Sequence, residues 1–479
     1  MMQMQPFRAA PVTWKPTTYM KTCVEWLIKH PAAALFLDPG LRKTSITLAA
    51  FLLLKQAKIA RKMLVIAPLR VCYQVWSKSG ELGKWLEFKD LTVSLLHGGK
   101  KEEALQVDAD IYAINRDALA WLVAEKRLDS LLKRGVDVLV LDELSSFKHT
   151  RTQRFRALKP YLPRFKRRWG LTGSPAANGL MDLFGECYAL DLGKALGKFV
   201  THYRFQYFYP TGFQGKEWVL QPGAEKRIYD AIRPLALSMK ATDHLVDLPQ
   251  LVEQNIWVEL PPEARKIYDS LKENFIAAIK DGTITAVNAA VLSGKLRQVA
   301  SGGVYLHPEW TMSFEDTKVT QIHMAKSEAL KELVDELQGE HLFVGYEFHH
   351  DYERMQAGGL PGVPTINGDT NPKESELLCQ RWNFGELPIL TAHPAAVGHG
   401  LNLQGSHCAH VCWYTCPWNY ELYDQFNRRV YRSGNQAKRV IVHRILARDT
   451  IDEVVVSCLR QKGRTQKMLF EALKEHFGC

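Results

Sequence analysis

The stretch from Pro31 to Lys58 constrains the fold most strongly. It begins with a short apolar run, PAAALFL, passes through the loop DPGLRK and continues as TSITLAAFLLLKQAK. The apolar run is typical of a buried strand, and the last segment has helical length and ends in cations. A loop between a strand and a helix can direct backbone amides and the helix N-terminus at one anion. The sequence therefore predicts a phosphate-binding loop in an α/β sheet.

This loop keeps the groups that hold phosphates but departs at one position. Lys43 is expected to reach the β- and γ-phosphates of a nucleotide, and the Thr44 hydroxyl to hold Mg²⁺. Gly40 and Leu41 are followed by Arg42, where such loops carry glycine. A left-handed backbone, which glycine adopts freely, costs another residue about 1–2 kcal/mol. The Arg42 side chain is expected either to lie outward or to add positive charge near the phosphates.

Two further apolar runs extend the predicted sheet. KMLVIA leads into Pro68 and a helix, and VDVLVLDE ends in two carboxylates, Asp142 and Glu143. Open α/β sheets place their ligands at the carboxyl ends of strands. Asp142 is therefore expected to hold the Mg²⁺ hydration shell, and Glu143 to orient and deprotonate an attacking water. A lone Asp-Glu pair is usually a solvated strand end, but the order of loop and carboxylates favours one nucleotide-binding sheet.

Charge and composition narrow the class of partner. The 479 residues carry a net charge of +11, and the segment 144–181 contains nine lysines and arginines and no acid. A surface for nucleic-acid phosphates and a solvated helix face both fit this segment. The N-terminus lacks the apolar core of a signal peptide, and no apolar run approaches the roughly 18–20 residues that span a bilayer, so a cytoplasmic protein is expected. Cys408, Cys412 and Cys416 fall in a strand-like run, which favours buried thiols over a zinc site.

The second half repeats the alternation of apolar runs and helical segments. HLFVGYEF, LPILTAH, CAHVCWYT and KRVIVHRIL are rich in β-forming residues and are separated by helical or glycine- and proline-containing segments. This pattern predicts a second doubly wound α/β lobe. The aromatic run HYRFQYFYP, between the two halves, is more typical of hydrophobic packing than of base stacking.

In their order, the motifs resemble those of the superfamily-two helicase-like ATPases, and most closely the remodeller-type (sucrose non-fermenting) family of DNA translocases in its short prokaryotic and phage form. The first half supplies DPGLRKT, IAPLRV, DELS and LTGSPAANGLMDLF, and the second half KLRQVASGGVY, INGDT, GHGLNLQ, QFNRRVYRSGNQ and TIDEVV. The match runs from about Trp14 to the C-terminus. Besides Arg42, two departures are Met20, where the family usually has a glutamine that reads adenine, and Asn435, an apparent one-residue insertion.

The resemblance implies two RecA-like, doubly wound parallel-sheet lobes with helical protrusions. The lobes would cover residues 1–240 and 241–479, with protrusions at about 181–235 and 261–298. ATP would lie between the lobes, with Arg429 and Arg432 as arginine fingers and Gln425 as a nucleotide contact. The residues implied in DNA contacts are Pro68, Arg70, Thr172, Ser174, Gly368, Thr370 and Gly398.

Taken together, the motifs imply a DNA-dependent ATPase that uses ATP and Mg²⁺ to move along duplex DNA, with single-stranded DNA as a second track. The family form implies a bacterial cytoplasm, or a host cytoplasm for a phage-encoded chain. Two other functions stay open: a catalytically impaired nucleotide- and DNA-binding scaffold, and an ATPase subunit of a nuclease or restriction complex. The intact charged residues argue against the scaffold, and the nuclease role would require a partner chain.

Overall fold

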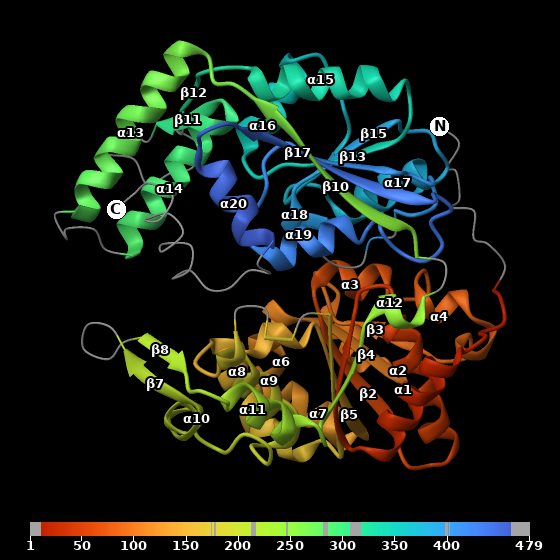
Figure 1. The fold of residues 1–479 in the computed structure, drawn as a ribbon. Helices are drawn as coiled ribbons and strands as arrows, with labels where there is room; N and C mark the ends of the chain where they lie inside the picture. The colour runs from red at the N-terminus through yellow and green to blue at the C-terminus, as the bar shows by residue number, and fades with distance from the viewer. Residues whose placement is uncertain are drawn as a thin grey trace. The chain divides into compact units, whose positions relative to one another are not determined.

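The fold is known from a computed structural model that describes residues 11–173, 175–176, 179–211, 217–245, 248–280, 286–306, 318–397, 401 and 403–460. The chain divides into two compact units, Met1–Val246 and Asp247–Cys479, which we call lobe 1 and lobe 2. Each lobe is built on its own parallel sheet, with helices packed against it (Figure 1). The predicted fold class, α/β with two parallel-sheet lobes, is confirmed.

Lobe 1 contains a seven-stranded sheet in the order β3-β4-β2-β5-β6-β1-β9. All paired neighbours in it run parallel. Its strands are β1 Ala32–Leu37, β2 Lys62–Ala67, β3 Val93–Leu95, β4 Ile111–Asn115, β5 Val136–Asp142, β6 Arg167–Thr172 and β9 Ala236–Met239. Most of these runs are apolar almost throughout, because helices cover both faces of a parallel sheet.

The helices of lobe 1 are short, apart from the first two. They are α1 Thr18–Lys29, α2 Lys43–Gln56, α3 Leu69–Gln74, α4 Glu81–Lys84, α5 Lys101–Gln106, α6 Leu119–Val123, α7 Arg127–Lys133, α8 Gln153–Leu158, α9 Leu183–Asp191, α10 Val200–Tyr207, α11 Ala224–Ile232 and α12 Ala241–His244. An antiparallel hairpin of β7 Phe208–Thr211 and β8 Glu217–Leu220 follows α10. The insertion expected here is therefore part helix and part hairpin.

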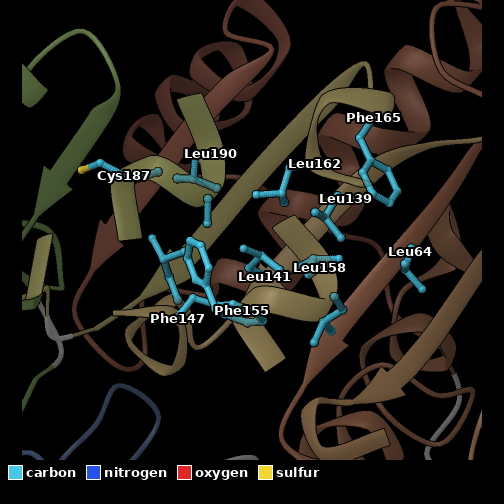
Figure 2. Packing of buried hydrophobic residues seen from close by; sticks show 14 of the residues in the cluster. Leu64, Leu139, Leu141, Phe147, Phe155, Leu158, Leu162, Phe165, Cys187 and Leu190 are labelled. Carbon is cyan, nitrogen blue, oxygen red and sulfur yellow. The ribbon is translucent and has the colours of Figure 1, made fainter. Parts of the chain in front are cut away.

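Part of the lobe 1 core lies between β5 and two of the covering helices. Leu139 and Leu141 of β5 pack in one cluster with Leu158 of α8 and with Cys187 and Leu190 of α9 (Figure 2). All five side chains are almost completely buried. The expectation of a protrusion from about residue 181 onward was therefore wrong for α9, which packs in the core and covers the sheet.

Lobe 2 contains a six-stranded sheet in the order β10-β17-β16-β13-β15-β14, again with parallel neighbours. Its strands are β10 Gln250–Val258, β13 Leu342–Gly345, β14 Thr365–Ile366, β15 Ile389–Ala392, β16 His410–Trp413 and β17 Arg439–Ala447, with a separate antiparallel pair, β11 Gly303–Leu306 and β12 Lys318–Gln321. Its helices are α13 Pro262–Lys280, α14 Ala286–Ser301, α15 Ala325–Leu337, α16 His349–Ala357, α17 Pro372–Asn383, α18 Pro394–Val397, α19 Tyr420–Asn427 and α20 Ile451–Arg460.

The parallel order of the strands decides where polar side chains can gather. In lobe 1 the carboxyl ends of β1, β2, β5 and β6 share one edge, and the phosphate loop, Pro68, the Asp-Glu pair and Thr172 lie at or directly after these ends. Ligands of open parallel sheets bind at this edge. Within the described part of the chain, no helix is both long and apolar enough to cross a membrane.

Candidate nucleotide site and its surroundings

The loop between β1 and α2 turns sharply before the helix begins. Gly40 has a φ of 93°, and Arg42, at the N-cap of α2, has φ 51° and ψ 38°, which is left-handed. The carbonyl of Arg42 accepts a hydrogen bond from the amide of Ile46 at 3.2 Å, so the helix starts immediately afterwards. The first amides of a helix have no intrahelical acceptor and attract anions. The loop therefore has the local geometry that phosphate binding requires.

The Arg42 side chain is exposed and turns toward Trp85. Its guanidinium carbon lies 5.6 Å from the centroid of the Trp85 ring. Of the two expected placements, the outward one is therefore observed. A cation–π contact contributes about 0.5–2 kcal/mol, which is comparable with the roughly 1–2 kcal/mol that a left-handed non-glycine residue costs.

Lys43 follows at the first position of α2 and folds back over the loop. Its ammonium donates hydrogen bonds to the carbonyl oxygens of Leu37, at 2.7 Å, and Asp38, at 3.4 Å. Its charge also lowers the pKa of Asp142, at the end of β5. The charges of Lys43, after β1, and of Asp142, at the end of β5, are therefore close enough to influence one another.

Burial and hydrogen bonding set the ionisation of Asp142. Burial, together with the nearby carboxylate of Glu143, raises the pKa of its carboxyl group to about 6. A hydrogen bond from the indole Nε1 of Trp76 to Oδ2, at 2.6 Å, and the charge of Lys43 act in the opposite direction. A carboxylate that is costly to ionise gains most from a cation placed beside it.

Glu143 is held by two hydroxyl groups. Its backbone is left-handed, with φ 65°, and Oε1 accepts hydrogen bonds from Ser145, at 3.3 Å, and from Thr172, at 3.4 Å. Thr172 is completely buried. The expected DNA contact of the Thr172 side chain was therefore wrong, because a buried hydroxyl cannot reach a nucleic-acid strand. Its position links the end of β6 to the carboxylate of Glu143.

The strand end of β6 also touches the phosphate loop. A Cβ atom placed on Gly173 would lie 2.9 Å from Cδ of Pro39, which no real side chain tolerates without a shift. Glycine is thus required for the close approach of the two loops.

The residues present fit a nucleotide-bound Mg²⁺. This ion is commonly held by one or two carboxylates together with substrate phosphates. Asp142 supplies a carboxylate near Lys43, and Thr44 supplies a hydroxyl in the first turn of α2, where its side chain is partly exposed. A nucleotide-bound Mg²⁺ would neutralise phosphate charge, with Asp142 and Thr44 as its protein ligands.

In lobe 2, the arginines expected in the nucleotide site differ in exposure. Arg429 is 9% exposed, and its guanidinium donates to the carbonyl oxygens of Gln425, at 3.1 Å, and Leu401, at 2.9 Å. Arg432 is half-buried. Gln425 is buried and donates to Oε1 of Glu421 at 3.1 Å. Arg429 is therefore built into lobe 2, and Arg432 is the more accessible of the two.

The inserted residue Asn435 also has a structural place. Its amide nitrogen donates to the carbonyl oxygens of Cys408, at 2.8 Å, and Val430, at 3.0 Å, and its amide oxygen accepts from Ala437 at 3.0 Å. These bonds tie the segment after α19 to the residues that precede β16. The departure from the family pattern is thus accommodated by buried hydrogen bonds.

The residues expected to contact DNA differ in how exposed they are. Pro68 is buried at the start of α3, and Arg70 is half-buried on that helix. Gly368 is exposed, and Thr370 closes the same turn by bonding to Asn367, with 3.0 Å between the Thr370 hydroxyl and Oδ1. Ser174 and Gly398 lie outside the described residues. Of the described positions, the Thr370 turn in lobe 2 and Arg70 in lobe 1 remain the accessible ones.

Several cations of the basic segment 144–181 have ion-pair or hydrogen-bond partners within lobe 1. Lys148 pairs with Asp182 at 3.2 Å, Lys166 lies 3.6 Å from Asp137, and Arg164 pairs with Asp129. Arg167 and Arg168 donate to backbone carbonyls. Lys148, Arg167 and Arg168 are therefore bonded within lobe 1, whereas Arg164 and Lys166 have ion pairs but stay exposed. The exposed cations of the segment are Arg151, Arg156, Lys159, Arg164 and Lys166, and Arg154 is half-buried.

Other sequence-based interpretations also have outcomes. Cys408, Cys412 and Cys416 are buried, as expected. Met20 is 2% exposed in α1. In the aromatic run, Tyr203, Tyr207 and Phe208 are buried in the lobe 1 core, whereas Phe205 and Tyr209 are exposed. Packing therefore explains the first three and not the last two.

Sequence reasoning missed Trp76, Trp85 and the Tyr73–His97 pair, whose hydroxyl and Nδ1 lie 2.6 Å apart. For Trp76 the sequence offered one signal, namely that the indole N–H of a buried tryptophan usually has a hydrogen-bond partner. The partner itself, Asp142, lies far along the chain. Nothing in the spacing of Trp85 indicated a contact with Arg42.

The fold and this site define a class: a two-lobed α/β protein whose first lobe has a lysine-bearing phosphate loop and paired carboxylates on one sheet edge. Comparison with known proteins gives the family. Residues 19–301 match the SNF2-related domain. The chain is 31% identical, over 478 residues, to protein p41 of Acyrthosiphon pisum secondary endosymbiont phage 1, with 96% of this chain and 99% of that protein covered. The chain belongs to the SNF2-related family.

Other relatives are longer. A Bacillus subtilis protein that bears the name of an ATP-dependent helicase/translocase is 26% identical over 481 residues, covering 95% of this chain and 48% of that protein. The chain thus spans almost all of the phage protein but about half of the bacterial one. Among solved structures, the Sulfolobus solfataricus SWI2/SNF2 ATPase core in complex with dsDNA is similar, with a TM-score of 0.43, 21% identity and coverage of 98% of this chain and 96% of the other.

Proposed function

We propose that the protein hydrolyses ATP with Mg²⁺ in response to DNA and uses the energy to move along duplex DNA. The observation that carries the proposal is the placement of the phosphate loop with Lys43 and of the carboxylates Asp142 and Glu143 at the carboxyl ends of parallel strands of one sheet, where Lys43 lowers the pKa of Asp142. Family membership supports the same activity, because relatives are named as ATP-dependent helicases.

Each residue of the site has a distinct role in this proposal. Lys43 and the first amides of α2 bind the β- and γ-phosphates. Asp142 and Thr44 hold the metal that accompanies the nucleotide. Glu143, fixed by Ser145 and Thr172, accepts a proton from the attacking water. Charge that develops on the γ-phosphoryl group is stabilised by Arg432, with Arg429 holding the adjoining backbone.

Duplex DNA is proposed as the track because the chain is basic and its family relatives include DNA-acting proteins. Arg70 of lobe 1 and the turn at Thr370 of lobe 2 are proposed to contact phosphates, and such contacts read no sequence. Binding is therefore expected to weaken steeply as salt rises. The exposed left-handed Arg42, turned toward Trp85, supports a working phosphate loop over a decayed one.

The test is ATP hydrolysis by the purified protein without DNA, with duplex DNA and with single-stranded DNA of equal length. Duplex-stimulated turnover is expected. Movement is measured separately, by displacement of a third strand bound to the duplex, which requires translocation but no separation of the duplex strands. Turnover that DNA leaves unchanged, or stimulation without displacement, would contradict the translocase.

A further inference from the structure

We propose that Trp85 is a positioning residue for the phosphate loop: its stacking against Arg42 holds the left-handed backbone that glycine would otherwise supply. The inference deepens the proposed ATPase function, since it concerns the same loop. It assigns a role to the departure at Arg42 and to a tryptophan outside every motif of the sequence.

The backbone at Arg42 sets the direction of the loop amides. With φ 51° and ψ 38°, this residue reverses the chain immediately before Lys43 and Thr44. An L-residue with a side chain resists this conformation, and relaxation toward the right-handed region would rotate the amides that follow. Because glycine has no Cβ, it meets no such resistance. An arginine at this position therefore needs a contact that keeps it there.

Trp85 provides a fixed surface for that contact. It is 7% exposed, and its indole Nε1 donates to Oε2 of Glu81 at 2.6 Å. The guanidinium of Arg42 lies over the ring, with 5.6 Å between the guanidinium carbon and the ring centroid. The ammonium of Lys84 also lies over this ring, at 4.8 Å from the centroid. Two cations thus share one ring, but only Arg42 belongs to the phosphate loop.

The N-terminal segment holds the same short stretch in place. The amide of Val12 donates to the carbonyl of Lys84, and the amide of Leu86 donates to the carbonyl of Val12, both at 3.0 Å. The amide of Trp14 donates to Oε2 of Glu87 at 2.8 Å. The ring of Trp85 is therefore fixed from its backbone as well as from its indole N–H. The contact also connects the phosphate loop to the segment that leads into α1.

The geometry points to nucleotide binding that depends on Trp85 only for certain residues at position 42. If the ring holds a strained residue in place, then Trp85 matters only while position 42 carries a side chain that resists the left-handed region. Arg42→Gly removes the resistance and the need for the ring together. Arg42→Ala keeps the resistance and removes the contact.

The experiment measures KM and kcat for ATP at saturating duplex DNA, and the affinity for a fluorescent ADP analogue. The variants are Arg42→Ala, Arg42→Gly, Trp85→Ala, Trp85→Phe and the combination of Arg42→Gly with Trp85→Ala. Trp85→Ala and Arg42→Ala should each raise KM and weaken ADP binding by about three- to tenfold, while kcat stays near the wild-type value. Trp85→Phe, which keeps an aromatic face, should lie close to wild type.

The combined variant is decisive. In the Arg42→Gly background, Trp85→Ala should change neither KM nor ADP affinity. Lys84→Ala is the matched control, because it removes the other cation from the same ring and should leave both quantities unchanged. An equal rise in KM with and without Arg42→Gly would overturn the inference, as would equal ADP affinities of Arg42→Ala and Arg42→Gly. The latter pair keeps the test valid if Trp85→Ala does not fold.

The two readouts separate this inference from the proposed function. The variants could bind nucleotide in the expected pattern while the protein shows no DNA-stimulated hydrolysis. This result would support the positioning role of Trp85 and contradict the proposed ATPase activity. Hydrolysis with no coupling between Arg42 and Trp85 would do the reverse. A wild-type protein that binds no nucleotide at all would contradict both.

Discussion

The predicted nucleotide-site residues of lobe 1 and lobe 2 differ in how the protein holds their charges. In lobe 1, Asp142 has a pKa raised to about 6 by burial, and Arg42 has a left-handed backbone. In lobe 2, the guanidinium of Arg429 already donates to the backbone carbonyls of Gln425 and Leu401. Lobe 1 thus maintains charged groups in unfavourable states, and lobe 2 uses a predicted site residue to hold its own backbone.

This difference indicates which lobe binds the nucleotide and which presents an ordered surface. Groups held in costly states gain most when a ligand relieves that cost, so lobe 1 is expected to bind the nucleotide. A buried arginine bonded to carbonyls fixes a loop, so lobe 2 is expected to present an ordered surface. Variants of the lobe 1 site residues should therefore lose chemistry, whereas a variant of Arg429 in lobe 2 should lose stability.

The largest effect is expected at Glu143. The substitution Glu143→Gln keeps the shape of the side chain and one hydrogen-bond acceptor but removes the base, so kcat should fall by up to about 10⁴-fold. ADP affinity and thermal stability should stay near those of the wild type. The comparison needs turnover at saturating ATP and duplex DNA, with nucleotide binding measured in parallel. Unchanged turnover would rule out Glu143 as the base.

The two arginines of lobe 2 provide the next contrast. Arg432→Ala should lower kcat by about 10³-fold, the lower end of the range for an arginine finger, without a change in melting temperature. Arg429→Ala should also destabilise lobe 2, since hydrogen bonds from a charged donor are worth roughly 1.5–3 kcal/mol each. Thermal unfolding and turnover of both variants decide the matter. Equal stability losses in the two would contradict the division of roles.

The sequence predicted the strands and the phosphate loop because both depend on local patterns. The run of apolar residues before Gly40 and the helical segment after Thr44 required no information from elsewhere in the chain. Side-chain direction was different, because it depends on partners far along the chain. Thr172, the last residue of β6, lies inward because Glu143 and β5 pack against the end of this strand, and the neighbouring residues in the sequence gave no sign of this.

Some cations were misinterpreted for the same reason. Arg167 donates to carbonyls at the end of α1, and Arg168 donates to the carbonyl of Leu190 at the end of α9. A run of basic residues shows charge but not whether backbone carbonyls of other helices lie within reach. The roles of Trp76 and Trp85 were unpredictable for a related reason, because each acts through one contact made by tertiary folding.

Acidification should lower the free energy of unfolding of lobe 2 more than that of lobe 1. All of the buried histidines in the described residues lie in lobe 2. Burial lowers the pKa of His323 and that of His443 to about 4. In the unfolded chain both titrate near 6.5, so the unfolded state binds more protons as pH falls from about 6.5 to 4. The free energy of unfolding should then drop by up to roughly 3 kcal/mol per histidine.

Pulse proteolysis in denaturant at pH 7 and pH 5 measures this effect, with fragment masses identifying the lobe that opens. Lobe 2 should lose more stability than lobe 1. The variant His443→Gln, which does not titrate, should show a smaller loss at pH 5 than the wild type. An equal pH dependence of wild type and variant would remove His443 from the explanation.

The smallest expected effect concerns Trp76, which sharpens the picture of lobe 1. Its indole N–H lowers the pKa of Asp142 and fixes Oδ2. Trp76→Phe removes this donor, so the pKa of Asp142 should rise and a larger fraction of the carboxyl should be protonated near pH 6. The Mg²⁺ concentration at half-maximal turnover should then increase by about three- to tenfold, and by more at pH 6 than at pH 8.

Trp169→Phe is the matched control for Trp76→Phe. Trp169, in β6, is as fully buried in lobe 1 as Trp76, but its indole N–H donates to the carbonyl of His30 at 3.3 Å. Both substitutions remove similar volume and one hydrogen bond, so both should lower stability to a similar extent. Only Trp76→Phe should change the Mg²⁺ requirement and its pH dependence. A similar shift in Trp169→Phe would mean that looser packing of the sheet, and not the bond to Asp142, controls the site.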